Sequence, residues 1–383
     1  MLRFITAGES HGPGLTTVVE GLPAGLEVTV GGIGGELARR RLGYGRGARM
    51  AIEQDELEIL GGVRFGRTLG GPVSVVIRNT EWPKWRQQMD PAPGERGKRE
   101  RRPRPGHADL AGMLKYDTHD ARDILERASA RETAARTVVG YLSKQVLDVL
   151  GVTVMSHVTA IGDVVVDGTI KPGPEDIMRI DASPVRVADA GVEPAMIAAV
   201  EAAQAAKDTL GGSVEVLVHD VPAGLGSHVH WDRKLDGRLA GALMSIPAIK
   251  AVEIGDGITQ SRSPGTQAHD EIIHDAGRFD RRSNHAGGLE GGITNGDVVR
   301  VTAYMKPIAT VMQPLDTVDV DTKEAAKAFR ERSDVCAVPA AGVVAEQMAA
   351  FVFADEALRT YGGDTIDDLR RAHAAVVDRI ERF

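Results

Sequence analysis

The clearest pattern of apolar and polar positions lies between residues 130 and 150. Its apolar members are three or four residues apart, the spacing that places side chains on one face of a helix: Ala135, Val139, Leu142, Val146 and Leu150. Ser129 and Glu132 form the S-x-x-E pattern of a capping box, and Gly151 is a suitable stop. The sequence therefore predicts an amphipathic helix over 130–150.

The remaining pattern predicts a chain in which helices and strands are mixed. Apolar residues recur with a helical period at 33–42, 194–209, 231–246, 322–331, 340–354 and 365–381. Alternating or β-branched runs predict strands at 15–20, 26–30, 73–78, 152–158, 213–219 and 297–305. Asn295-Gly296 lies between strand-forming segments and predicts a tight hairpin turn. This order favours a mixed α/β or α+β fold, and the chain shows no dinucleotide-binding fingerprint.

Two stretches of the chain are similar to each other. PGLTTVVEGLPAGL at 13–26 and GSVEVLVHDVPAGL at 212–225 are β-rich runs that end in a Pro-Ala-Gly turn. Each precedes a predicted helix, which carries Arg39 in the first case and Arg238 in the second. Two related halves fused into one fold would explain the match, although four identical turn residues can also arise by coincidence.

Length and composition limit the possible architectures. The chain has 383 residues, of which 42% are hydrophobic and 26% charged, enough for one large domain or two ordinary ones. The similar stretches favour a single domain over 1–383, with duplicated halves at about 1–200 and 201–383. The one cysteine, Cys336, excludes an internal disulfide and a cysteine-based metal cluster.

The chain carries no signal for export or membrane insertion. No uninterrupted apolar run approaches the roughly 18 residues of a membrane span. The N-terminal residues lack the basic and apolar stretches of a signal peptide. We therefore expect a soluble, cytoplasmic protein that does not use a membrane.

Arginines gather in two places, although the net charge is −8 and the isoelectric point about 5.8. The two groups are Arg39, Arg40, Arg41, Arg46 and Arg49, and Arg96, Lys98, Arg99, Arg101, Arg102 and Arg104, the latter just before His107. Because a guanidinium fork binds phosphate and carboxylate, the groups predict a site for a multiply charged anion. Nucleic acid is the alternative, but a duplex-binding protein would be basic overall. The second group is also compatible with a solvated loop.

The segment GESHG at 8–12 fits the G-x-S-x-G pattern of a serine hydrolase. In that fold the oxyanion hole takes an amide from a loop earlier in the sheet, and nine preceding residues cannot hold such a loop. Either the segment presents His11 for catalysis or it is a plain glycine-rich turn.

Three further segments combine glycine with charged or histidine side chains. ERASARETAART places Arg127, Ser129 and Arg131 at a predicted helix start, where exposed amides favour an anion. SNHAGGLEGGITNGD surrounds His285 with glycines, as where backbone approaches a ligand, although a structural histidine is the more common case. RSDVCAVPAAG places Asp334 before a helix, where an acidic residue is also ordinary.

Together these segments resemble the chorismate synthase family closely. The matching motifs, in the family's order and spacing over residues 8 to 339, are GESHG, RPGHAD, ERASARETA, ALMSIPAIKAVEIGDG, SNHAGGLEGGI, KPIAT and RSDVCAVP. Ala128 and Ala309 stand where many members carry serine, a change that concerns individual flavin contacts only.

The resemblance implies a fold and a reaction. The fold is a single-domain α+β protein, a β-α-β sandwich with two pseudo-symmetric halves, assembled as a homotetramer. The reaction removes phosphate and a ring proton from 5-enolpyruvylshikimate 3-phosphate to give chorismate, the last step of the shikimate pathway. Reduced FMN is required but not consumed: it donates an electron transiently and takes up the substrate hydrogen at N5. Without a reductase domain or dinucleotide fingerprint, we expect an external flavin reductase, with NADPH acting only through it.

The resemblance also assigns roles to residues. It implies that His11 protonates the departing phosphate, that His107 stabilises the reduced flavin, and that Asp334 helps the ring proton to leave. Ser10 is then no nucleophile. Substrate binding is implied for Arg40, Arg46 and Arg131. Flavin binding is implied for Arg127, Ala128, Ser129, Pro247, Ala248, Gly291, Lys306, Pro307, Ile308, Ala309, Thr310 and Arg332. No metal site is implied.

Overall fold

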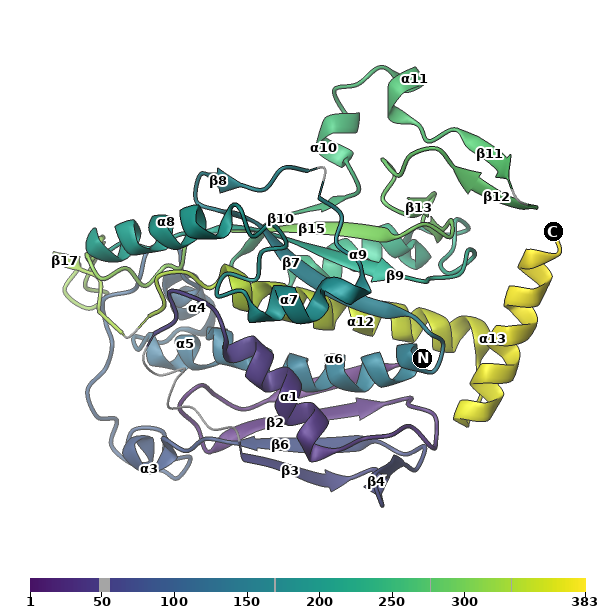
Figure 1. The fold of residues 1–383 in the computed structure, drawn as a ribbon. Coiled ribbons are helices and arrows are strands. Elements are labelled where there is room, and N and C mark those ends of the chain that lie inside the picture. Colours follow the sequence, from purple (N-terminus) through teal and green to yellow (C-terminus); the bar gives the residue numbers. More distant parts are fainter. Residues whose placement is uncertain (48–55, 169, 276, 332) are drawn as a thin grey trace.

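Two antiparallel sheets enclose a layer of helices in the computed structural model, which describes residues 1–47, 56–168, 170–275, 277–331 and 333–383 (Figure 1). The first sheet has the order β1-β2-β6-β3, and the second has the order β10-β15-β9-β7-β8. Their strands are β1 (Arg3–Ala7), β2 (Gly14–Glu20), β3 (Glu56–Gly61), β6 (Val73–Arg78), β7 (Thr153–Ile161), β8 (Val164–Val165), β9 (Gly212–His219), β10 (Ile249–Ile254) and β15 (Val299–Met305). This is the α+β sandwich that the sequence resemblance implied.

The helical layer consists of α1 (Val30–Arg41), α6 (Thr133–Asp148), α9 (Leu235–Met244) and α12 (Val338–Tyr361). Helix α12 packs against α1, α6, α9 and the second sheet, and its side chains are buried on all faces. By length and composition α12 would suit a membrane span, but 94% of that stretch is buried inside the protein. Its uniformly apolar surface is therefore explained by its central place between the sheets.

The two halves repeat the same local contacts. In each half a threonine hydroxyl donates to the proline carbonyl of the Pro-Ala-Gly turn and accepts from the leucine amide after it. The groups are Thr68 with Pro23 and Leu26, at 2.6 and 2.9 Å, and Thr294 with Pro222 and Leu225, at 2.7 and 2.9 Å. The conformation of the turn is therefore fixed in the same way twice.

The same correspondence extends to whole elements. The series β1, β2, α1, β6 and α6 corresponds in order and in sheet position to β7, β9, α9, β15 and α12. The helical arginines correspond too, since Arg39 on α1 bonds to Glu346 of α12 at 2.7 Å and Arg238 on α9 bonds to Glu356 at 2.7 Å. The repeated elements lie within 3–148 and 153–361, and the predicted duplication with halves at about 1–200 and 201–383 stays a prediction.

Most of the predicted elements are present. The predictions at 33–42, 194–209, 340–354 and 365–381 correspond to α1, α8 (Glu193–Ala205), α12 and α13 (Ile366–Glu381). A short 3₁₀ helix, Ala130–Glu132, precedes α6, and another, Trp231–Arg233, precedes α9. The strands predicted at 15–20, 73–78, 152–158, 213–219 and 297–305 are confirmed as β2, β6, β7, β9 and β15.

Three predictions are wrong. Residues 322–331 were expected to form a helix but contain β17 (Ala325–Lys327), which pairs with β16 (Asp316–Val318). The pairing of the two strands overrides the local helical preference there. The strand expected at 26–30 makes one isolated bridge, between Glu27 and Arg67, before α1 begins. Asn295-Gly296 is not a hairpin turn, since β14 (Ile293–Thr294) pairs with β13 (Leu289–Glu290) while β15 pairs with β9 and β10.

The capping prediction is half correct. The Ser129 hydroxyl accepts from the Arg131 amide at 3.2 Å and so caps the 3₁₀ turn. Glu132 does not bond back to Ser129; its carboxylate accepts from Thr6 at 3.0 Å and from Arg136 at 2.9 Å. Glu132 thus joins α6 to β1 instead of closing a capping box.

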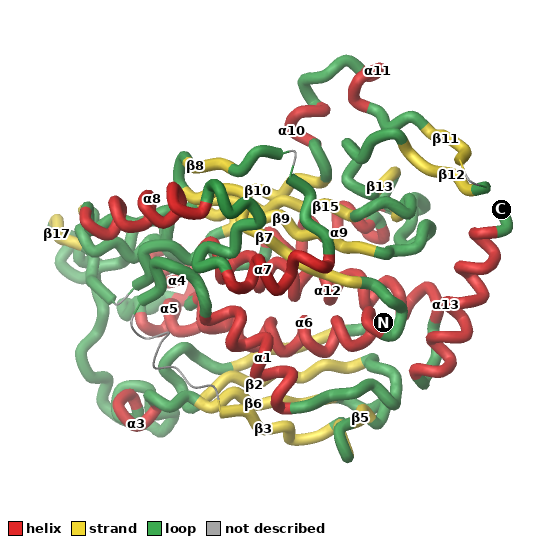
Figure 2. Tube along the Cα trace, in the orientation of Figure 1, coloured by secondary structure: helices red, strands yellow, loops and turns green. Residues whose placement is uncertain are grey.

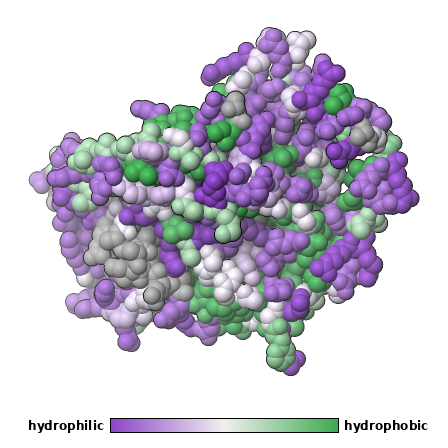
Figure 3. Space-filling view, in the orientation of Figure 1, coloured by the Kyte–Doolittle hydropathy of each residue, from purple (hydrophilic) through white to green (hydrophobic). Residues whose placement is uncertain are grey.

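The remaining elements lie around the sandwich (Figure 2). They are β4 (Val63–Arg64), β5 (Arg67–Thr68), α3 (Trp82–Trp85), α4 (Asp109–Tyr116), α5 (Arg122–Ala128), α7 (Ile177–Ala182), α10 (Gly257–Gln260), α11 (Gly265–Ala268), β11 (Ile272–Asp275) and β12 (Arg278–Arg281). Figure 3 shows polar side chains over most of the visible face, with apolar ones in smaller areas between them. The apolar residues are therefore mainly used in the sandwich interior.

Candidate active site

A cavity of about 840 Å³ lies at one end of the helical layer. The ends of α1 and α9 and the starts of α6 and α12 meet there, so corresponding elements of both halves contribute to its wall. The predicted site residues in its lining are His11, Arg40, Arg46, His107, Ala128, Ser129, Arg131, Pro247, Ala248, Lys306, Ile308, Ala309, Thr310 and Asp334. The fold thus brings together segments that are more than 300 residues apart in the chain.

Three of the predicted site residues that the structure describes are not in this lining. Arg127 donates to the carbonyls of Thr6 and Gly8 at 2.8 and 3.0 Å, behind the wall. Gly291 lies in the turn between β13 and β14, and Pro307 lies between two lining residues without lining the cavity itself. Arg332 falls outside the described residues. The flavin contacts implied for these four therefore stay predictions.

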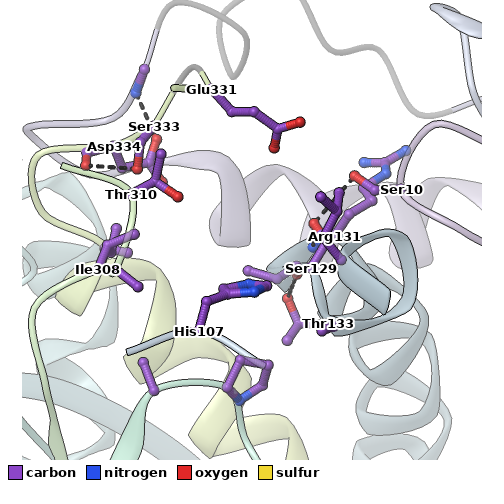
Figure 4. Close-up of a pocket in the computed structure, with 18 of the residues that line it drawn as sticks. Ser10, His107, Ser129, Arg131, Thr133, Ile308, Thr310, Glu331, Ser333 and Asp334 are labelled. Carbon is purple, nitrogen blue, oxygen red and sulfur yellow. Dashed lines mark hydrogen bonds between the residues drawn. The ribbon is translucent and has the colours of Figure 1, made fainter. Parts of the chain in front are cut away.

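Figure 4 shows the open space of the cavity with two facing sides. Ser10, Ser129 and Arg131 lie on one side, and Ile308, Thr310 and Asp334 lie on the other. His107 and Glu331 approach from the two remaining sides. A ligand in the cavity would therefore contact both halves of the chain.

His11 is held in a fixed orientation by Glu126 of α5. Its Nδ1 lies 2.9 and 3.1 Å from the two carboxylate oxygens, and its backbone amide donates to the same group at 2.8 Å. The Trp85 ring covers the imidazole with 3.9 Å between ring centroids. Burial raises the pKa of Glu126, but the hydrogen bond and charge of His11 outweigh this and keep the pKa below its ordinary value. Glu126 is therefore an ionised partner that fixes the His11 ring in place.

His107 is held in a similar way by Asp109, to which its Nδ1 hydrogen-bonds. Arg104 donates to the same carboxylate through Nε at 2.8 Å and Nη2 at 3.1 Å. Although burial acts to raise the pKa of Asp109, the bonds from His107 and Arg104 lower it to about 2. The RPGHAD motif thus forms a compact arginine–carboxylate–histidine unit.

The arginines expected to bind anions are fixed by neutral or acidic groups of the protein. Arg40 is buried, and it donates to the Thr133 hydroxyl at 2.9 Å and the Ala130 carbonyl at 3.0 Å. Arg46 lies 3.2 Å from Asp334, whose carboxylate also accepts from the Gly47 amide at 2.7 Å. The Nε of Arg46 is buried and has no hydrogen-bond partner among the described residues. Since an unsatisfied buried donor is costly, this atom is available to donate a hydrogen bond to a ligand in the cavity.

Part of the cavity lining, called the apolar side below, consists of apolar and mostly small side chains. It includes Ile246, Pro247, Ala248, Ile308, Ala309, Ala337, Ala340 and Ala341, which follow α9 and β15 or begin α12. Lys306 bonds to the Gly106 carbonyl, which joins this side to the RPGHAD segment. Short side chains leave a broad surface on which a flat ring can lie.

Several functional candidates have no role in the sequence-based prediction. Glu126 is the first residue of the ERASARETA motif, Arg122 and Glu331 lie close to recognised motifs, and Trp85 stacks on His11 from α3. Arg104 belongs to the second group of basic residues, for which the sequence predicts no role at His107. A carboxylate next to a catalytic motif is a weak signal, because only the tertiary contacts distinguish it from an ordinary surface residue.

The basic segment docks on the protein. Arg99 bonds to Asp321 at 2.8 Å, and Arg101 lies 3.3 Å from Asp321 and 3.5 Å from Asp319. His285 is absent from the cavity lining and hydrogen-bonds to Asp256 at 2.8 Å, as expected of a structural histidine. In the described part of the chain, no cluster of three or more His, Cys, Asp or Glu side chains could hold a metal ion.

Comparison with known proteins identifies this architecture. A family model described as chorismate synthase matches residues 2–358. Chorismate synthase of Salinispora tropica is 58% identical over 389 residues, covering 99% of both chains, and that of Kocuria rhizophila is 57% identical over 380 residues, covering 97% of this chain and 91% of that protein. A solved structure entitled "Crystal Structure of Chorismate Synthase" aligns with TM-score 0.80 and 38% identity, over 100% of this chain and 99% of that one.

Proposed function

Since the chain belongs to the chorismate synthase family, we propose that the cavity binds 5-enolpyruvylshikimate 3-phosphate beside reduced FMN. The protein is a carbon–oxygen lyase of the shikimate pathway, which removes phosphate from this substrate in a trans-1,4-elimination that gives chorismate. The observation that carries the binding proposal is that three arginines and a group of small apolar side chains line the same cavity.

The cationic side suits the substrate, which carries two carboxylates and a phosphate. The name cationic side covers the lining residues Arg40, Arg46 and Arg131, and the buried Arg46 Nε supplies an unused donor. In a site of low dielectric, each charge-assisted hydrogen bond contributes about 1.5–3 kcal/mol. Several such bonds offset the cost of removing a multiply charged ligand from water.

The apolar side suits the isoalloxazine ring of FMN. A cavity of about 840 Å³ has room for a flavin together with a small ligand, and Ala248, Ala309 and Ala340 leave space for a flat ring. Residues 306–310 and Ser129 would provide backbone and hydroxyl contacts. Reduced FMN, when bound, would supply the transient electron that assists loss of phosphate.

The protein would control the protons of the reaction. His11, polarised by Glu126, would donate a proton to the departing phosphate. His107, oriented by Asp109, would stabilise negative charge on the reduced flavin. Asp334 would assist departure of the ring proton, and its contact with Arg46 couples that role to substrate binding.

Three further properties belong to this proposal. Reduced flavin would come from a separate flavin reductase, so NADPH would act only indirectly. The protein would be cytoplasmic, and it would assemble as a homotetramer. The family relationship and the absence of a dinucleotide fingerprint in the sequence support these points.

The test is anaerobic turnover by the purified protein with chemically reduced FMN. Chorismate and phosphate should appear in equal amounts. Oxidised FMN with NADPH should give no turnover until a flavin reductase is added. Turnover with NADPH alone would contradict the external reductase, and no chorismate with reduced FMN would contradict the function itself.

A further inference from the structure

The two cavity histidines are held by matching chains of charged groups. On one side Arg122 donates to Glu126 at 2.6 Å, and Glu126 holds His11. On the other side Arg104 donates to Asp109, which holds His107. Each histidine therefore has a carboxylate at Nδ1 and an arginine bound to that carboxylate, although Arg104 Nη2 also lies 3.1 Å from His107 Nδ1.

Both arginines converge on Glu331. Arg122 Nη2 donates to its Oε1 at 3.1 Å, and Arg104 Nη1 lies 3.6 Å from its Oε2. One carboxylate thus closes a continuous series of contacts that runs from His11 through Glu331 to His107. Figure 4 shows Glu331 and His107 on different sides of the open cavity, so the series passes around the ligand space.

The series is shielded from water along most of its length. The side chains of Arg104 and Arg122 are 6% and 10% exposed, and that of Glu331 is 24% exposed. An aromatic ring covers each guanidinium, with Phe329 4.7 Å from Arg104 and Trp85 5.0 Å from Arg122. Charges in such surroundings influence one another more strongly than they would in water.

We propose that Glu331 is a positioning residue that couples His11 to His107. The proposal rests on the proposed function for its catalytic meaning, because these histidines are the expected proton donor and flavin partner. Through its two arginines, Glu331 fixes both histidine-holding carboxylates at once.

The charges give the coupling a direction. Glu126, Glu331 and Asp109 contribute three negative charges, and the two arginines contribute two positive ones. Neutralising Glu331 removes the excess negative charge, so a protonated imidazole at either end loses stabilisation. The other charged groups that line the cavity around the two rings are Arg40, Arg46, Glu81, Lys84, Arg131, Lys306 and Asp334, and the test leaves them unchanged.

The experiment measures the pH profile of hydrogen–deuterium exchange at imidazole Cε1 of His11 and His107, by mass spectrometry of peptides from the free protein. Glu331→Gln should move both profiles to lower pH, by about 0.5 to 1 unit at an effective dielectric constant near 20. Glu331→Asp, which keeps the charge, should restore most of both shifts. Asp321→Asn is the matched control, since this carboxylate binds Arg99 and Arg101 outside the series and should move neither profile.

A shift at one histidine alone, or at neither, would overturn the coupling. If Glu331→Gln does not fold, Asp109→Asn tests the same proposal. Asp109 lies at the opposite end of the series from His11, so a shift of the His11 exchange profile in this variant would support the coupling, and an unchanged profile would overturn it. In turnover assays Glu331→Gln should lower kcat about 10-fold and leave KM nearly unchanged. The exchange measurement needs neither substrate nor flavin, so it distinguishes failure of the coupling from failure of the proposed function.

Discussion

The two halves of the protein share one architecture but contribute different chemistry to the cavity. In the described lining, the first half supplies both histidines and all the arginines, while the second half supplies most of the apolar side chains and the acidic Glu331 and Asp334. Corresponding helices nevertheless meet at the same place. Two halves with the same packing can thus differ at the ends of their helices, where side chains face a ligand instead of the core.

The largest effect is expected in the first half, at His11. His11→Ala removes the proton donor but leaves the arginines and the apolar side intact. Because general acid catalysis contributes a factor of about 10² to 10⁴, kcat should fall by that factor with little change in substrate affinity. Anaerobic steady-state kinetics measure both quantities. Ser10→Ala is the control and should cost far less; the reverse order would show that the GESHG segment has been misread.

The next effect concerns the ion pairs that Glu346 of α12 makes inside the helical layer. Glu346 is buried and bonds to Arg39 and Lys144, so Glu346→Gln should lower the free energy of unfolding by about 3–5 kcal/mol. Burial raises the pKa of Glu346, but Arg39 and Lys144 hold it well below its ordinary value of 4.5. The stabilisation is therefore complete above about pH 4.5 and is lost as the pH falls below that value.

Urea unfolding at several pH values tests the Glu346 prediction. The difference in the free energy of unfolding between wild type and Glu346→Gln should be constant from pH 5 to 7 and should become smaller at acidic pH. The control is Asp378→Asn. Asp378 lies on α13 and forms an exposed ion pair with Arg382, so this substitution should change the free energy of unfolding little at any pH. A difference that widens in acid would contradict the assigned sign.

A third prediction concerns the cationic side. Arg46→Ala should weaken substrate binding roughly 10- to 100-fold, because a charge-assisted bond in a buried site is worth about 1.5–3 kcal/mol. FMN binding without substrate should change little. Isothermal titration with each ligand separates the two effects. Arg101→Ala, in the docked basic segment, should matter far less, and equal losses would assign the substrate to that segment.

The smallest effect is expected on the apolar side, in the second half. Ala309→Leu places extra bulk where the flavin ring is proposed to lie, so FMN binding should weaken by about 1–3 kcal/mol. Fluorescence titration with FMN measures this loss. Ala325→Leu, on the exposed β17, is the control. Unchanged FMN affinity in Ala309→Leu would place the ring elsewhere.

The motifs that carry the chemistry were recognisable because each is a short run of neighbouring residues. GESHG, RPGHAD and RSDVCAVP each combine glycine or proline turns with a reactive side chain, and the segments converge on one cavity. The sequence therefore predicted the fold class, the family and many of the residues that line the cavity. It failed at 322–331, where pairing of β17 with β16 overrides a helical pattern.

By itself the sequence determined which side chains were available for catalysis, since histidine, arginine and aspartate at fixed local spacing restrict the chemistry before folding. Only the tertiary structure decided which of these groups act together. The contacts from Glu331 to Arg104 and Arg122 join residues more than 200 positions apart, and no local pattern distinguishes this glutamate from one on the surface. Long-range contacts of this kind depend on how α5, the RPGHAD segment and the start of α12 pack, and packing is a property of the whole sandwich.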